Sequence, residues 1–163
     1  MELFSIRSKK LVVIVCLLVF VLSLASCVVA EDKVIASLGK YEKREYFTSG
    51  GFQDYTDYAK YYYSSAEIVE NPYLTKIQES DLATIEEYLD DFEQWIELIR
   101  QSGEGSEVVN GYDFCRAWID TDDYYYIDAE EHTWSDGYTS LVSYDVYFYD
   151  AQTQVLYYFH NNI

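Results

Sequence analysis

Basic residues are scarce in this chain: 11 Lys and Arg stand against 29 Asp and Glu, a formal net charge of −18 at pH 7. Positions 117–163 hold nine acidic residues and no Lys or Arg. Such a chain repels phosphate backbones and anionic headgroups, so nucleic acid is excluded as a partner. Cations and basic partners are favoured, although acidity also serves simply to keep a surface soluble.

Recognisable catalytic motifs are absent as well. The sequence contains no serine in a nucleophile-elbow context, no phosphate-binding pattern and no zinc-ligand spacing. It has two histidines, His132 and His160, and nothing in the sequence places either beside Cys115, as an activated thiolate would require. These absences favour a protein that is not an enzyme, with a hydrolase as the least favoured function.

The N-terminal segment has the features of an export signal. Three basic residues before position 11 are followed by an apolar stretch over 11–22 and then by small residues. Positions 24–27, Leu-Ala-Ser-Cys, resemble the lipobox of bacterial lipoproteins. This resemblance, which covers residues 1–27, implies that Cys27 is lipidated and holds the domain on the extracytoplasmic face of the cell membrane. The alternative is an uncleaved anchor, because 11–30 is about as long as a membrane crossing requires.

Cleavage before Cys27 predicts three parts: a signal peptide over 1–26, a lipidated N-terminus and tether over 27–40, and a single globular domain over 41–163. Loss of the signal peptide would take the formal charge to about −20. Cys115 would then have no partner, so no internal disulfide is expected. Because Cys115 lies in an apolar stretch, we expect it to be a buried thiol.

Apolar spacing predicts two helices in the first part of the domain. Positions 52, 55, 59, 62 and 66 recur at three and four residues, which predicts a helix that ends before Asn71 and Pro72. A second helix is predicted from Leu82 to Arg100, where apolar residues step by three and four through about five turns. Ser80 is its expected N-cap.

Four strands are predicted from residue 112 onward, because aromatic and β-branched runs alternate with turn-forming segments. They cover 113–119, 124–129, 141–149 and 155–160, and their short links predict an antiparallel meander. With the long helix packed on one face of the sheet, the predicted fold class is α+β. This order of elements is similar to that of cystatin-like and nuclear-transport-factor-like folds, a resemblance that implies no function.

Tyrosine is unusually abundant, with 19 residues that all follow position 40. Strands favour aromatic residues, so packing within the sheet accounts for many of them. Exposed tyrosines would instead suit sugars, peptides or protein surfaces. The candidate binding residues are Tyr124, Tyr126, His132, Trp134 and Asp136, of which the last three share one predicted loop.

One acidic stretch has a partial calcium-site pattern, because hard cations need several oxygen ligands close together. The candidate ligands are Asp120, Asp122, Asp128 and Glu131. Tyr125 occupies the position where an EF-hand loop needs glycine. A solvated hairpin turn is therefore favoured over calcium, and no other cofactor is expected.

Three functions remain open from the sequence. The favoured one is a noncatalytic, membrane-anchored binding module for a peptide, glycan or protein partner. The second is a structural or regulatory accessory subunit of a cell-envelope complex, which would expose an apolar patch. The third is a hydrolase, which would need a cleft with convergent titratable groups. The oligomeric state is not predicted.

Overall fold

The computed structural model describes residues 32–50, 55–103, 106–135, 137 and 139–162, so Cys27 and the predicted signal peptide lie outside it. The chain divides into two units, 1–32 and 33–163, and the second contains all the elements named here. In chain order these are α2 (Lys33–Ser37), β1 (Lys43–Thr48), β2 (Tyr55–Tyr62), β3 (Thr75–Lys76), α3 (Leu82–Ser102), α4 (Glu107–Gly111), the 3-10 turn η1 (Arg116–Trp118), β4 (Tyr124–Thr133), β5 (Thr139–Asp150) and β6 (Val155–Asn162).

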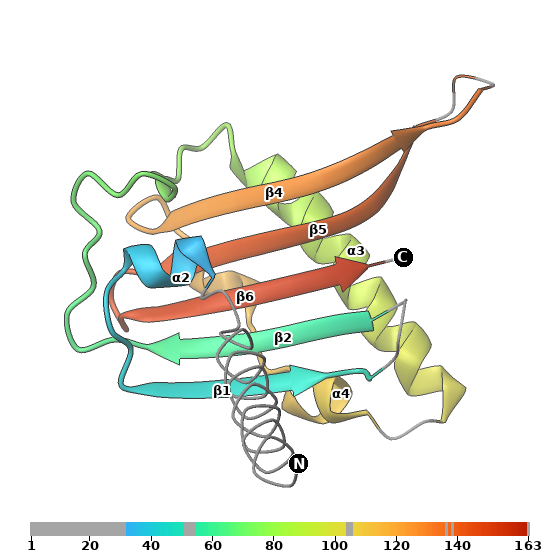
Figure 1. Ribbon diagram of the computed structural model, residues 1–163, viewed down its shortest axis with the longest axis horizontal. Coiled ribbons are helices and arrows are strands. Elements are labelled where there is room, and N and C mark those ends of the chain that lie inside the picture. Colours follow the sequence, from blue (N-terminus) through green and yellow to red (C-terminus); the bar gives the residue numbers. More distant parts are fainter. Residues whose placement is uncertain (1–31, 51–54, 104–105, 136, 138, 163) are drawn as a thin grey trace, which may run out of the picture. The chain divides into compact units, whose positions relative to one another are not determined.

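The strands form one antiparallel sheet in the order β1-β2-β6-β5-β4-β3 (Figure 1). β4, β5 and β6 follow one another as a meander, and β2 pairs with the other side of β6. The predicted α+β class, with an antiparallel sheet and one long helix packed on it, is confirmed. Among the described residues the sheet has six strands rather than four, and the long helix lies mid-sequence rather than at the N-terminus.

Helix α3 covers the first face of the sheet, and its spacing of apolar residues produces the predicted buried stripe (Figure 1). Ile85, Leu89, Phe92 and Ile96 are each at most 2% exposed. The N-cap is Asp81 rather than the predicted Ser80. At the other end, Gly103 stops the helix in the left-handed conformation, at φ 76°, which glycine adopts without a steric penalty.

The second face of the sheet is covered by α2 and by the segment that follows β2 (Figure 1). Val34, Ile35 and Leu38 are buried there against sheet residues that include Tyr147 and Leu156. The predicted tether over 27–40 is therefore too long, because its last part belongs to the folded core.

The helix predicted over 52–66 is wrong, since residues 55–62 form strand β2. Residues 56–61 are all buried, so successive side chains enter two different cores and no alternation of apolar and polar residues marks the strand. Pairing with β1 on one side and β6 on the other supplies the backbone hydrogen bonds. Tertiary pairing thus overrides an apolar spacing that suits a helix.

The strand predicted over 113–119 is also wrong, because this segment forms turn η1 and the extended residues around it. Arg116 forms ion pairs with Asp90 at 2.7 Å and Glu93 at 2.8 Å, which hold the segment against α3. Phe114 is buried in the core, whereas Cys115 is exposed, so the expectation of a buried thiol is wrong.

Candidate functional site

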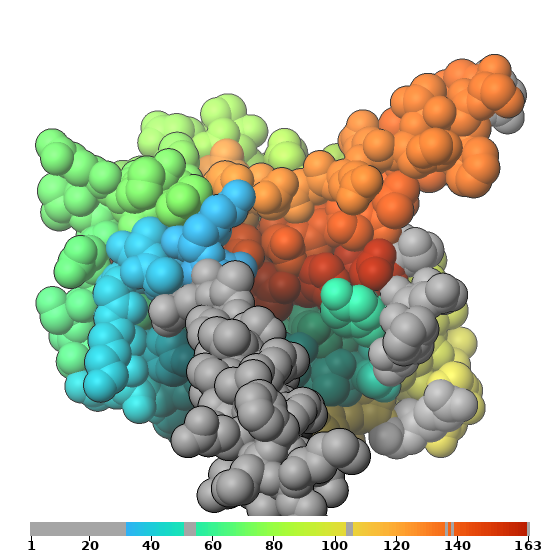
Figure 2. Space-filling view, in the orientation of Figure 1, coloured from blue at the N-terminus to red at the C-terminus, as the bar shows by residue number. Residues whose placement is uncertain are grey.

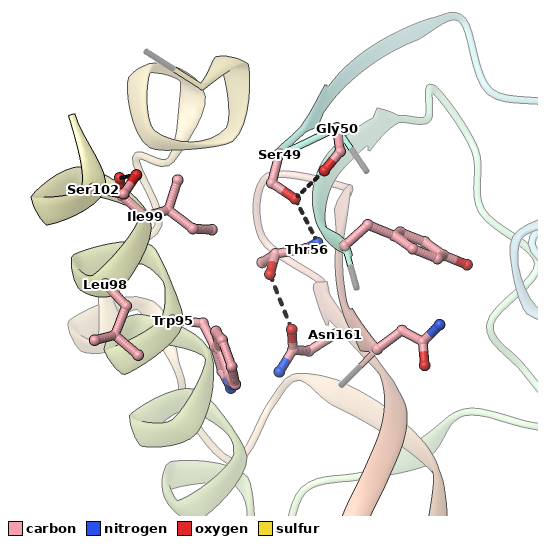
Figure 3. A pocket seen from close by; sticks show the side chains of 10 residues that line it. Ser49, Gly50, Thr56, Trp95, Leu98, Ile99, Ser102 and Asn161 are labelled. Atoms are coloured by element: carbon pink, nitrogen blue, oxygen red, sulfur yellow. Dashed lines mark hydrogen bonds between the residues drawn. The ribbon is translucent and has the colours of Figure 1, made fainter. Parts of the chain in front are cut away.

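A groove of about 280 Å³ opens between the C-terminal half of α3 and the strand ends at the adjoining edge of the sheet (Figure 3). Four of its residues lie on α3 at helical spacing, which places them on one side of the helix. The others come from the end of β1, the start of β2 and the end of β6. The lining residues are Ser49, Gly50, Tyr55, Thr56, Trp95, Leu98, Ile99, Ser102, Asn161 and Asn162.

Hydrogen bonds between strand ends hold the polar side of the groove. Thr56 and Asn161 lie directly opposite each other on β2 and β6, and the Thr56 hydroxyl donates to Asn161 Oδ1 at 2.9 Å (Figure 3). The backbone N–H of Thr56 donates to Ser49 Oγ at 2.8 Å. Asn161 is only 1% exposed, so its amide is a fixed part of the fold. The groove is therefore largely preformed.

A carboxylate beneath the groove connects it to the core. Asp91 Oδ2 accepts a hydrogen bond from the Tyr144 hydroxyl at 2.9 Å, and the Asn161 amide donates to the same oxygen at 3.5 Å. Burial, together with the Asp91 charge, raises the pKa of Tyr144 well above its usual range. The Tyr144 hydroxyl therefore remains a donor across the physiological pH range.

Every described residue that lines the groove is uncharged at neutral pH, although the chain carries a net charge of −18. Trp95 extends from α3 toward the strand ends that carry Thr56 and Asn161 (Figure 3). The described lining combines the indole of Trp95 and two aliphatic side chains with hydroxyls and amides, whereas the Tyr55 ring packs on His160 at 4.7 Å between centroids, on the other face of the sheet. This set can stack on an apolar surface and hydrogen-bond neutral groups, and the described lining residues offer no carboxylate, imidazole, amine or thiol for proton transfer.

No known protein family is matched. No family model matches this chain, and no curated protein or solved structure does. Its function therefore has to be inferred from its own residues. Among the residues that the structure describes, no helix is long and apolar enough to span a membrane.

The structure separates the predicted binding residues. Tyr124 and Tyr126 are half-buried on the second face, where the ring of Tyr126 lies 5.9 Å from that of Tyr73 between centroids. His132 and Trp134 lie at the far end of the β4–β5 hairpin, about 20 Å along the strand from Tyr126 at ~3.3 Å per residue. Asp136 lies outside the described residues.

The arm is the far end of this hairpin: residues 128–133 of β4, residues 134–135 that follow it, and residues 139–143 of β5. Its β4 residues from 128 to 133 are all exposed, and the arm projects from the body of the domain (Figure 2). The rings of His132 and Trp134 pack edge to face at 4.6 Å, and Trp134 Nε1 donates to Ser140 Oγ at 3.2 Å. Trp134 remains 55% exposed.

The predicted calcium ligands do not converge. Asp120 Oδ1 accepts from the Asp122 backbone N–H at 2.7 Å, and the Asp122 carboxylate pairs with Lys76 at 3.0 Å. Asp128 and Glu131 lie farther along β4, both on the arm. In the described part of the chain, no three His, Cys, Asp or Glu side chains are grouped to hold a metal ion.

The residues that line the groove were missed by sequence reasoning. Trp95 is one of three aromatic residues on a charged helix, and Asn161 lies among other polar residues at the end of its strand. No local pattern marks either of them, because the groove forms only when three distant segments meet.

Proposed function

We propose that this protein is a noncatalytic binding module, anchored outside the cytoplasm by a lipid on Cys27, whose groove binds a neutral glycan. The uncharged character of the described lining residues, in a strongly acidic chain, carries the proposal. Sugar rings present apolar faces that stack on indole rings, and their hydroxyls pair with amides and hydroxyls. A lining of tryptophan, asparagine, serine and threonine supplies both kinds of contact.

A noncatalytic role is supported by the chemistry of the same lining. Glycoside hydrolysis generally uses two carboxyl groups on either side of the scissile bond. None of the described residues that line the groove is acidic, and the Asp91 carboxylate, which Asn161 of the lining contacts, is engaged by Tyr144 and Asn161. We therefore expect bound sugar to be released unchanged.

Binding is tested with the full-length chain in micelles of a detergent without a sugar headgroup, by isothermal titration calorimetry against neutral oligosaccharides. Trp95→Ala should weaken binding about tenfold or more, because one stacked aromatic contributes on the order of 1–3 kcal/mol when fully used. Trp134→Ala on the arm is the matched control and should bind normally. Equal affinities for the two variants, or binding of uncharged peptides alone, would contradict the glycan proposal.

The lipid anchor has its own test in Cys27→Ala. A lipoprotein should lose its acyl groups and its signal-peptide processing with this change, whereas an uncleaved anchor would be unaffected. Mass spectrometry of the membrane-extracted protein measures both properties. If the Cys27→Ala variant and the wild type differ in mass only by the substitution, the protein carries no lipid on Cys27 and is held by a spanning anchor.

The arm supports a second candidate function, that of an accessory subunit. A two-stranded ribbon is marginally stable by itself, and this one displays an exposed tryptophan. A photo-crosslinking residue placed at Trp134 should give one discrete larger species in intact cells if the arm docks on an envelope complex. The same residue placed at Leu98, on the rim of the groove, is the control. Cross-linking from Leu98 but not from Trp134 would show that the arm is not the interface.

A further inference from the structure

A second cluster of polar and aromatic side chains lies on the second face of the sheet, where β2, β6 and β5 run side by side. His160 on β6 is directly opposite Asp57 on one side and Asp145 on the other. Directly opposed residues in an antiparallel sheet hold their side chains about 4.5–5.5 Å apart at Cβ. An imidazole is thus placed between two carboxylates, and the cluster is completed by Tyr46, Tyr55 and Tyr158.

One of the carboxylates fixes the orientation of the imidazole. His160 Nδ1 lies 2.7 Å from Asp145 Oδ1, which also accepts a hydrogen bond from the Tyr158 hydroxyl at 2.7 Å. An ionised carboxylate only accepts, so Nδ1 carries the proton in this pair. In the neutral ring Nε2 is then an acceptor.

Two buried acceptors of this cluster have no hydrogen-bond partner in the part of the chain that the structure describes. Asp57 is 5% exposed, and its Oδ2 accepts from the Tyr46 hydroxyl, whereas its Oδ1 has no hydrogen bond to any described residue. His160 Nε2 is likewise buried without a partner among the described residues. Folded proteins seldom leave such atoms unpaired, and here two of them belong to opposed residues. Asp57 Oδ1 and His160 Nε2 are both acceptors while the imidazole is neutral. Neither can donate to the other, so both need a donor from elsewhere.

The aromatic rings around His160 indicate which kind of donor can satisfy these two atoms. The Tyr55 ring lies 4.7 Å from the His160 ring between centroids, and the Tyr158 ring lies 6.3 Å from it on β6. Aromatic faces and carboxylates together attract a cation, and the acidic chain raises the local concentration of cations. A metal ion is disfavoured, because no third ligand joins the pair in the described part of the chain.

We propose that Asp57 Oδ1 and His160 Nε2 form a binding site for a primary ammonium group, supplied either by a lysine side chain of a partner or by a free amine. An ammonium has three donors and can satisfy both acceptors at once. A narrow alkyl stem behind the ammonium suits a site at Asp57, which is only 5% exposed, whereas the planar fork of a guanidinium is broader.

The two histidines make the site directly observable by nuclear magnetic resonance. In the full-length chain with ¹⁵N-labelled imidazoles, His160 reports on the site, and His132 on the arm is an internal control. The probes are methylammonium chloride, methylguanidinium chloride, potassium chloride at equal ionic strength, and a short peptide tested with lysine or norleucine at one position. We expect methylammonium to shift the His160 Nε2 resonance saturably, with little effect from potassium or methylguanidinium and none on His132.

The peptide pair identifies the source of the ammonium. If the lysine peptide binds more tightly than methylammonium and the norleucine peptide does not bind, a lysine of a partner is the ligand. If only methylammonium binds, the ligand is a free amine. No saturable shift with either, equal shifts of both histidines, or an Nε2–H already donating to Asp57 in the free protein would overturn the proposal.

Substitutions distinguish a specific loss of ammonium binding from a general loss of the fold. Asp57→Asn keeps the size of the side chain and should weaken methylammonium binding about tenfold or more, as expected for one charge-assisted hydrogen bond. Asp128→Asn, an exposed acid on β4, is the control. Asp145→Asn is a second variant. It removes the carboxylate that fixes the orientation of the His160 ring, and it leaves the two acceptors, Asp57 Oδ1 and His160 Nε2, in place. Trp95→Ala should leave methylammonium binding unchanged, so failure here is distinct from failure of the glycan groove.

Discussion

The two faces of the sheet bury different aromatic residues. All four phenylalanines that are buried in the described part of the chain, Phe92, Phe114, Phe148 and Phe159, belong to the core beneath α3. The core of the second face buries four tyrosines and no phenylalanine among its described residues. Phenylalanine contributes by packing alone, whereas a buried tyrosine must also place its hydroxyl. The first core also buries three tyrosines, Tyr58, Tyr144 and Tyr157, and two of them donate to carboxylates, so the two faces differ in where phenylalanine is buried rather than in where tyrosine is. The abundance of tyrosine is therefore in large part a property of the whole sheet.

The largest effect should follow a change in the first core. Phe92→Ala removes a fully buried ring that contacts Phe159 at 5.3 Å between centroids, and it should lower the free energy of unfolding by about 3–5 kcal/mol. Leu98→Ala on the same helix, where the side chain is 47% exposed, should cost much less. Chemical denaturation measures both, and similar losses would show that α3 is not anchored through its predicted stripe.

An ion-pair network at the rim of the first face predicts a dependence on pH. The Lys60 ammonium lies 2.9 Å from Glu45 and 2.7 Å from Asp113, with its side chain 10% exposed. Hydrogen bonds from Lys43, Lys60 and Tyr62 lower the pKa of Glu45 to about 2, from an ordinary value of 4.5. Because the folded-state pKa is the lower one, the network stabilises the fold above pH 4.5, and this stabilisation is lost as the pH falls toward 2.

Glu45→Gln should therefore lower the free energy of unfolding at pH 7 by about 1.5 kcal/mol, the lower end for a hydrogen bond to a charged group, since Asp113 still pairs with Lys60. It should also flatten the loss of stability between pH 4.5 and about 2. Thermal unfolding at several pH values measures this. Glu107→Gln, an exposed change, is the control and should keep the wild-type pH profile.

A smaller effect should distinguish two neighbouring tyrosines of β6 that face opposite sides of the sheet. Tyr158→Phe removes the donor to Asp145 on the second face and should cost about 1 kcal/mol. Tyr157→Phe on the first face removes a hydroxyl with no hydrogen-bond partner among the described residues, and should change stability by less than about 0.5 kcal/mol. Equal losses of unfolding free energy for the two variants would show that the hydrogen bond from Tyr158 to Asp145 adds no net stability.

The smallest effect belongs to the arm, which lies outside both cores. Trp134→Ala should alter the free energy of unfolding by less than about 0.5 kcal/mol, because the side chain is 55% exposed. A cooperative loss of stability in denaturation would show instead that the arm supports the sheet.

The sequence by itself determined the elements whose local pattern agrees with their final environment. Helix α3 has one buried stripe at helical spacing and a glycine after its last turn, and both features are local. The β4, β5 and β6 strands are aromatic runs between turn-forming segments, so the α+β class could be predicted. The acidic balance and the lipobox-like segment likewise depend on composition and on adjacent residues.

Only the tertiary structure decided the identity of β2 and the arrangement of both candidate sites. Strand β2 is buried on both faces, so no alternation marks it, and its partners lie on either side of it in the sheet. Asp57 and His160 are more than 100 residues apart in sequence, and strand pairing alone brings them into register. Trp95 and Asn161 meet at the groove because α3 packs across the sheet that holds β6. Local sequence carries the preferences of each element, but long-range pairing selects which side chains become neighbours.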